Sequence, residues 1–245
     1  MKRILAAFVF LIVPLLALAE EGGEALDHAP IDLNDKISLQ RGAAAFVNHC
    51  LNCHSASLMR YARLEDLGLT EAQIRNFLVF TDAKVGDTMT AAMDPKIAKA
   101  AFGVVPPDLS LAARSRSPDW LYTYLRSFYR DPNSKTGWNN TAFPNVAMPH
   151  VLWEYQGTQA LQVDEKMDDN TGDMKVASRL VLEKPGKMSP LEYDRYTADL
   201  VNYLAYMGEP AQASRRHWGI LVIFFLAGFF VLTLLLKQEY WKDVR

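Results

Sequence analysis

Two cysteines and a histidine stand together in the run Cys50-Leu51-Asn52-Cys53-His54. This spacing is typical of a c-type haem attachment site, in which both thiols form thioether bonds to the haem and the histidine binds the iron. Both cysteines of the chain lie in this motif. The motif therefore predicts one covalently attached haem c, bound by Cys50, Cys53 and His54.

Three other uses of a cysteine pair fit the chain less well. A structural zinc site needs four nitrogen or sulfur ligands, and the chain has no second cysteine pair. A thioredoxin-like redox pair would stand near a βαβ pattern, whereas the residues before Cys50 are patterned as a helix. A disulfide between Cys50 and Cys53 would leave His54 without a role.

A haem used for electron transfer commonly takes methionine on the other face of the iron, which raises the reduction potential. The chain after residue 19 offers Met59, Met89, Met93, Met148, Met167, Met174, Met188 and Met207. Met148 lies between Pro144 and Pro149, which restrict the backbone and can hold a weak ligand in place. We predict Met148 as the sixth ligand, with Met93 and then Met89 as the alternatives.

Several helices must position these residues. Apolar residues at helical spacing over 38–48 predict a helix that ends at the motif. Capping signals predict further helices after Thr70, Ser117 and Ser189, the last ending at Gly208. Irregular stretches over 79–116 and 131–188 remain, with one strand pair expected within 155–185 and Val176 to Leu182 as its clearest strand. The fold class is therefore mainly α: a c-type cytochrome domain with long haem-wrapping loops.

Both ends of the chain carry membrane-related segments. Residues 1–19 combine a basic start, an apolar core and a small-residue cleavage site, and predict a signal peptide. An uncharged apolar run over about 218–236 predicts one transmembrane helix across the lipid bilayer. Residues 20–214 would then form a periplasmic cytochrome c domain, and 215–245 the anchor and a short cytoplasmic tail. The expected location is the bacterial inner membrane, as a single-pass protein.

Charge is unevenly divided along the chain. Residues 20–214 carry 26 acidic and 19 basic side chains, so this domain is near −7. Such a surface predicts no nucleic-acid partner and favours a basic soluble protein through electrostatic steering. The acidic stretch 164–173 is a candidate docking surface, although a solvated acidic loop is the favoured interpretation.

Later motifs extend the match to a known family. They include Pro106-Pro107-Asp108-Leu109-Ser110, Ala147-Met148-Pro149, and Glu209-Pro210 leading to Arg215-Arg216 and the terminal apolar helix. With the attachment motif and Arg41-Gly42 before it, the chain resembles the cytochrome c1 family, in its bacterial form.

The resemblance implies roles for individual residues. It implies Met148 as the sixth ligand, Pro106 and Pro107 as haem-lining residues, and Arg114 as a partner of a haem propionate. An ordinary surface arginine is the alternative for Arg114. Trp120 stands where the family often has a tyrosine near the haem edge.

The resemblance also implies a function. The chain would be the haem subunit of the ubiquinol–cytochrome c reductase (bc1) complex, beside cytochrome b. It would take an electron from the Rieske iron–sulfur protein and pass it to a soluble or tethered c-type cytochrome. The chain alone would be no enzyme. Two rivals stay open: another membrane-tethered monohaem cytochrome, and a haem enzyme or ligand sensor with an open iron position.

Overall fold

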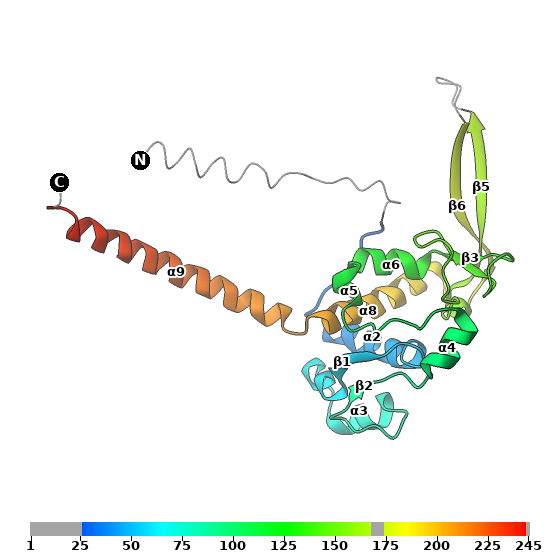
Figure 1. The fold of residues 1–245 in the computed structure, drawn as a ribbon, viewed down its shortest axis with the longest axis horizontal. Helices are drawn as coiled ribbons and strands as arrows, with labels where there is room; N and C mark the ends of the chain where they lie inside the picture. The colour runs from blue at the N-terminus through cyan, green and yellow to red at the C-terminus, as the bar shows by residue number, and fades with distance from the viewer. Residues whose placement is uncertain (1–25, 168–173, 244–245) are drawn as a thin grey trace.

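The structure, a computed structural model, describes residues 26–167 and 174–243, so the predicted signal peptide lies outside it. The helices in this part are α2 (Lys36–His49), the 3₁₀ helix η2 (Tyr61–Leu67), α3 (Glu71–Leu78), α4 (Pro95–Phe102), α5 (Ala112–Ser115), α6 (Pro118–Arg126), α7 (Trp153–Gln156), α8 (Pro190–Gly208) and α9 (Gln212–Tyr240). The strands form three antiparallel pairs: β1 (Ala56–Arg60) with β2 (Thr88–Met89), β3 (Phe128–Arg130) with β4 (Trp138–Asn140), and β5 (Gly157–Met167) with β6 (Met174–Pro185). The mainly α prediction is confirmed (Figure 1).

Helix starts predicted from local capping signals lie where expected. Thr70 and Ser189 each form a complete capping box, with Gln73 and Glu192 respectively. The Ser117 side chain accepts a hydrogen bond from the Trp120 amide at the start of α6. These caps satisfy backbone donors that a helix leaves without internal partners, and they fix where each helix begins.

The two stretches predicted as irregular contain more structure than expected. The segment 79–116 includes α4, which starts at the Asp94 cap and ends at Gly103 in the left-handed conformation. The segment 131–188 includes β4, α7 and the β5–β6 hairpin, whose strands of 11 and 12 residues exceed the predicted strand. The strand pair predicted within 155–185 is confirmed as β5–β6, whereas short elements such as α4 and β4 interrupt stretches that were expected to be irregular.

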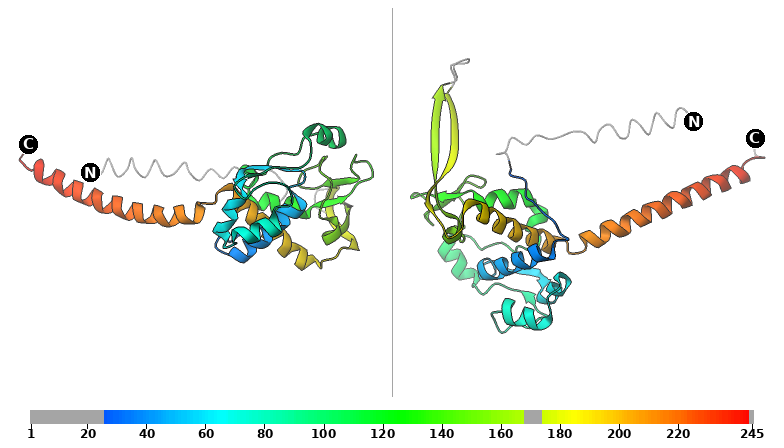
Figure 2. Two further views of the ribbon diagram at one scale, coloured as in Figure 1. Left: turned by 90° about the horizontal axis from the view of Figure 1, so that it is seen from below. Right: turned by 180° about the vertical axis from the view of Figure 1, so that it is seen from behind.

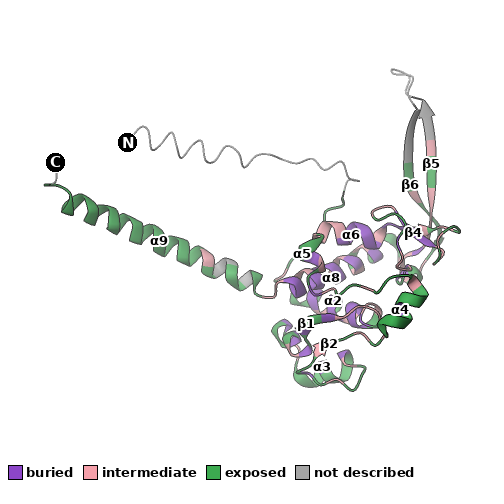
Figure 3. Cartoon of the chain, viewed as in Figure 1, coloured by how far each residue is buried: buried purple, intermediate pink, exposed green. Residues whose placement is uncertain are grey.

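The core lies where α2 crosses α8 (Figure 3). Gly42 on α2 lies so close to α8 that an added Cβ would collide with the Asp199 carbonyl oxygen and lie 2.7 Å from the Tyr203 Cβ. The rings of Phe46 and Tyr203, both fully buried, are 5.7 Å apart at this crossing. This packing fixes the C-terminal end of α2, where the cysteine motif begins.

The β5–β6 hairpin projects from the domain (Figures 1 and 2). Its register pairs Leu161 with Leu180 and Gln162 with Arg179. Arg179 hydrogen-bonds to Gln162 at 3.0 Å and pairs with Asp164 at 3.5 Å. Asp164 therefore already has a cationic partner within the hairpin, and the rest of the predicted acidic surface within 168–173 lies outside the described residues.

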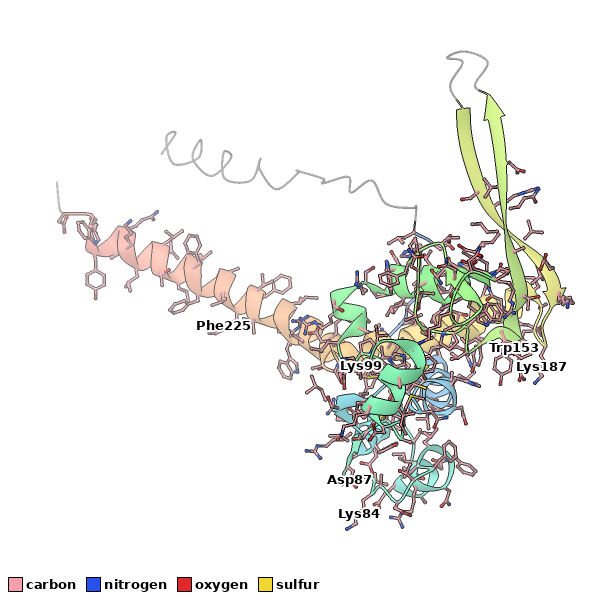
Figure 4. The ribbon with its side chains drawn as sticks, turned by 45° about the vertical axis from the view of Figure 1, so that its right-hand side comes forward. Lys84, Asp87, Lys99, Trp153, Lys187 and Phe225 are labelled. Atoms are coloured by element: carbon pink, nitrogen blue, oxygen red, sulfur yellow. The ribbon has the colours of Figure 1, made fainter. Side chains whose placement is uncertain are left out.

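Helix α9 extends away from the domain, and within Trp218–Tyr240 an 18-residue window has a mean hydropathy of 2.9 with none of that window buried. Figure 4 shows Phe225 on this separate helix, far from the packed side chains of the domain. Twenty-three residues of α-helix measure about 35 Å, enough to cross a bilayer core of about 30 Å. By its length and composition, this helix fits a membrane anchor. Only Glu209, Pro210 and Ala211 separate it from α8.

Candidate haem-attachment site

The cysteine motif follows directly from the end of α2. Cys50 is the C-cap residue, and its amide still bonds to the Phe46 carbonyl at 2.8 Å. The chain then turns, because the amides of Cys53 and His54 both bond to the Cys50 carbonyl, at 3.1 and 2.9 Å. The buried Leu51 anchors the turn in the core. All three motif side chains are thus carried by one tight turn on a packed helix.

The two thiols are free and partly buried. Burial raises the pKa of Cys50 to about 12 and raises the pKa of Cys53 as well. Reactive cysteine pairs of the thioredoxin type have a lowered thiol pKa, which is opposite to the direction found for Cys50 and Cys53. Within 26–167 and 174–243, no group of three or more His, Cys, Asp or Glu residues could hold a metal ion. The arrangement fits neither a zinc site nor a thioredoxin-like pair.

The imidazole of His54 is held in one tautomer. Its Nδ1 lies 2.7 Å from the Pro107 carbonyl oxygen. A carbonyl can only accept, so Nδ1 carries the proton and Nε2 keeps the free lone pair that an iron needs. Desolvation lowers the pKa of His54, although the Pro107 bond and the charge of Asp108 act in the opposite direction. The donor set therefore fits a haem bound through two sulfurs and one imidazole nitrogen.

The segment 106–110 is fastened to the chain just after the motif. The amide of Leu109 bonds to the Ser55 carbonyl at 2.8 Å, and the amide of Leu58 bonds to the Ser110 hydroxyl at 3.0 Å. Asp108 accepts from the amides of Ser57 and Ser110, both at 2.8 Å. Through these two hydrogen bonds, the Asp108 carboxylate holds the neighbouring Pro107 in position.

Asp108 stays ionised in this position. Burial alone would raise its pKa, but the hydrogen bonds from Ser110 and Ser57 outweigh it and lower the pKa below its ordinary value. The family resemblance implied Pro107 as a haem-lining residue but gave no sign of the role of its carbonyl, because that contact joins residues 53 positions apart. Pro106 is partly buried beside it.

Met148 lies in a loop that buried asparagines hold in shape. Asn140 is fully buried; its side-chain nitrogen donates to the Tyr124 carbonyl at 2.8 Å, and its oxygen accepts from the Phe143 amide at 3.1 Å. The oxygen of Asn139 accepts from the Asn145 amide at 2.8 Å. The partly buried Met148 packs against the core.

A tyrosine hydroxyl forms a hydrogen bond to the sulfur of Met148. The hydroxyl of Tyr124, on α6, donates to its Sδ at 3.4 Å. Pro144 and Pro149 were predicted to make this loop rigid, whereas the asparagines and Tyr124 belong to no sequence motif and were not predicted.

The remaining methionines have other surroundings. Met59, Met89 and Met207 are buried core residues, and the sulfur of Met89 accepts from the Tyr203 hydroxyl at 3.6 Å. The amide of Met93 bonds to the Asn52 carbonyl at 3.1 Å, so this residue lies beside the attachment turn itself. Met188 packs at the edge of the core. The side chains of Met167 and Met174 lie outside the described part.

Arg114 and Trp120 lie on neighbouring short helices. Arg114 on α5 is exposed, and its aliphatic stem covers Gly208, where an added Cβ would lie 3.2 Å from its Cγ. Among the described residues, no carboxylate pairs with it. Trp120 stacks on Tyr124 with 4.8 Å between ring centroids. The Arg116 guanidinium lies 5.2 Å from the centroid of the Trp120 ring and 6.0 Å from that of Phe143.

Behind Met148, a row of rings continues into the core. Tyr124 contacts Phe128 at 5.1 Å, and Phe128 stacks on His150 at 4.8 Å with nearly parallel planes. His150 also meets the edge of Trp138 at 5.1 Å. Only 2% of His150 is exposed, and desolvation lowers its pKa to about 4. This neutral histidine clamps the C-terminal side of the Met148 loop.

Comparison with known proteins adds a family. A model described as the cytochrome C1 family matches residues 27–178 and 185–244. The cytochrome c1 of Allochromatium vinosum is 49% identical over 245 residues, which cover 100% of both chains. The cytochrome c1 of Rhodospirillum rubrum is 26% identical over 276 residues, covering 100% of this chain and 97% of that one.

A further relative has a different name. A protein of Nitrosomonas europaea named ammonia monooxygenase gamma subunit is 52% identical over 234 residues, covering 96% of this chain and 95% of its own. The family match includes both the attachment turn and the apolar helix α9.

Proposed function

The chain belongs to the cytochrome c1 family, and from this membership we propose that Cys50 and Cys53 attach its haem while His54 and Met148 bind the iron. Proteins of this family carry one covalently bound haem c, and the chain is the electron-transfer haem subunit of the bc1 complex. The observation that carries the site assignment is the bond from His54 Nδ1 to the Pro107 carbonyl, which leaves Nε2 free within the attachment turn.

When bound, the haem supplies one-electron chemistry by alternating between the ferric and ferrous states. The protein contributes the rest. The turn after α2 holds both thiols for the thioether bonds, Pro107 orients the His54 ring, and the Met148 loop supplies a weak sulfur donor. Orienting contacts to metal ligands are expected to tune the potential as well as the geometry.

The assignment of Met148 is supported by its surroundings. Its loop is fixed to α6 and β4 independently of the attachment turn, whereas the backbone of Met93 bonds to that turn and the sulfur of Met89 is bonded inside the core. Replacing Met148 by leucine should abolish the ferric methionine–iron charge-transfer band and lower the reduction potential. Met93→Leu is the matched control and should preserve both. The reverse pattern would move the assignment to Met93.

Roles for Pro106, Pro107 and Arg114 follow from the same proposal. Pro106 and Pro107 would line the haem, and Arg114 would neutralise one propionate, since no carboxylate among the described residues occupies it. Arg114→Gln should then change the dependence of the reduction potential on pH, which a surface arginine would leave unaltered. Arg195→Gln, on the exposed face of α8, serves as a comparison.

The electron path is the next part of the proposal. The reduced Rieske iron–sulfur protein would give one electron to this chain and become oxidised, and this chain would then reduce a soluble or tethered c-type cytochrome. The chain makes and breaks no substrate bonds, so the enzyme is the complex, with cytochrome b as a further partner. Recovery of cytochrome b and a Rieske protein with the affinity-purified full-length chain would support these partners. Their absence from an otherwise intact preparation would contradict them.

The membrane arrangement is also proposed. A cleaved signal peptide over 1–19 would export residues 20–214 to the periplasm and leave 215–245 as the anchor and tail in the bacterial inner membrane. Protease added to intact spheroplasts should then digest the haem domain, and N-terminal sequencing should find Glu20 first. Protection of the domain from protease in intact spheroplasts would contradict the proposed periplasmic orientation.

A second candidate function comes from the Nitrosomonas europaea relative. Its name concerns an ammonia monooxygenase, and it is as similar to this chain as the Allochromatium vinosum cytochrome c1. This chain would then be a subunit of an ammonia monooxygenase, to which its proposed haem would supply electrons. The same purification distinguishes the two, because monooxygenase subunits would replace cytochrome b and the Rieske protein.

A further inference from the structure

Tyr124 contacts the Met148 loop at two points. Its hydroxyl donates to the Met148 sulfur at 3.4 Å, and its backbone carbonyl accepts from the Asn140 side chain at 2.8 Å. Asn140 in turn receives the Phe143 amide at 3.1 Å. A single residue of α6 thus fixes both the backbone of the loop and the sulfur at its end.

The ring of Tyr124 cannot easily move. One face stacks on Trp120 with 4.8 Å between centroids and 12° between planes. Its other neighbour, Phe128, meets it edge-on at 5.1 Å. Tyr124 is 9% exposed, and among the described residues its hydroxyl has no partner other than the Met148 sulfur. The hydroxyl is therefore preorganised toward that atom.

We propose that Tyr124 is a positioning residue for the iron ligand Met148, whose sulfur it both orients and makes a weaker electron donor. The proposal rests on the ligation by Met148 proposed above. A thioether sulfur has two lone pairs, so it can bind iron with one and accept a hydrogen bond with the other.

The hydrogen bond should raise the reduction potential. Electron density drawn toward the phenol is lost to the iron, and the ferric state depends more on donation than the ferrous state. Hydrogen bonds to metal-bound sulfur and to other ligands are a recognised means by which proteins set potentials.

The test is a redox titration of the full-length, haem-loaded chain in its complex, followed at the α band of haem c. Tyr124→Phe keeps the ring and its stacking but removes the hydroxyl. We expect the ferric methionine–iron band to remain and the redox equilibrium to shift about fivefold toward the oxidised form, as for loss of one net hydrogen bond. Since a tenfold change corresponds to 59 mV for one electron, the midpoint should fall by about 40 mV.

Tyr193→Phe is the matched control. It also removes a buried hydroxyl that bonds to α6, at the Leu125 carbonyl, 2.8 Å away, but it does not touch the sulfur. Its midpoint should match the parent protein even where its stability falls. An equal shift in both variants would assign Tyr124 a purely structural role and overturn the proposal.

A double-substitution cycle separates this proposal from the ligand assignment. In a Met148→Leu background, Tyr124→Phe should no longer move the midpoint, because the acceptor sulfur is gone. If Met148→Leu removes the charge-transfer band while Tyr124→Phe leaves the midpoint unchanged, the ligation stands and the role of Tyr124 falls. If Met148→Leu leaves the band intact, both fall.

Discussion

The guanidinium of Arg41 on α2 forms a bidentate ion pair with the carboxylate of Asp199 on α8, with Nε 2.5 Å and Nη2 2.9 Å from its two oxygens. The hydrogen bond and charge of Asp199 raise the pKa of Arg41 despite some desolvation. The pair lies beside Gly42, the closest approach of the two helices, so it clamps the crossing from the solvent side.

The crossing itself leads to a first prediction. Gly42→Ala should destabilise the domain by about 1–3 kcal/mol, because the new Cβ would meet the backbone of Asp199 and the two helices would have to separate. Gly86→Ala, where no atom lies within 4 Å of an added Cβ, should change little. Denaturant unfolding of both holoproteins measures the difference, and equal midpoints would contradict the close packing.

The two hydrogen bonds accepted by Asp108, next to Pro107, give a second prediction. Asp108→Ala should free the segment 106–110 from the amides of Ser57 and Ser110, at a cost of about 1–3 kcal/mol. His54 would then lose its fixed orienting carbonyl, and the ferric low-spin spectrum should broaden. Asp108→Asn keeps one acceptor oxygen and should be intermediate in both stability and spectrum. A ferric spectrum that is unchanged in both variants would contradict a role of Asp108 in orienting His54 through Pro107.

A third prediction concerns the loop that carries Met148. Asn140→Ala should cost about 2–5 kcal/mol, because it leaves a cavity and two backbone groups without their partners. Loss of the methionine–iron band should therefore occur at a lower temperature than in the parent protein. The exposed Asn133→Ala is the control, expected to be near neutral. Loss of the methionine–iron band at the same temperature in both variants would contradict the role of Asn140 in holding the loop.

His150 gives a fourth prediction, on pH. Its folded pKa of about 4 lies below the unfolded value near 6.5. Above pH 6.5 the ring is neutral in both states, and its titration takes nothing from the free energy of unfolding. As pH falls from 6.5 toward 4, the unfolded chain takes up a proton that the folded chain does not, and about 3 kcal/mol of stability is lost.

The measurement is the free energy of unfolding at pH 7 and at pH 4.5. His150→Phe keeps an aromatic ring on Phe128 and should flatten this part of the pH dependence. A slope that persists in His150→Phe would assign the acid sensitivity to other groups.

Local signals predicted the helices well. Thr70, Ser117 and Ser189 mark helix starts because a cap acts on amides two or three residues away, within reach of sequence reading. Strands β1 to β4 have five residues or fewer and take their form from partners elsewhere in the chain, so no periodicity announced them. The signals for α4, an Asp94 cap and a proline at 95, were present and were overlooked.

The candidate site divides in the same way. Cys50, Cys53 and His54 are contiguous, and their chemistry follows from spacing alone. The supports of His54 and Met148 come from Pro107 and Tyr124, 53 and 24 positions distant. Such contacts depend on how α6 and the 106–110 segment pack, which a single sequence does not reveal.

The short junction between α8 and α9 has a mechanical consequence. Three residues span about 10 Å at most, and an ion pair at 2.8 Å between Glu209 and Arg215 braces them. Helix α8 also packs against α2, which carries the attachment turn. The haem domain is therefore joined to α9 through its own core helix, without a long flexible linker. If the proposed donor and acceptor both bind this domain, so short a tether would leave it little freedom to move between them, and each would have to come to the haem.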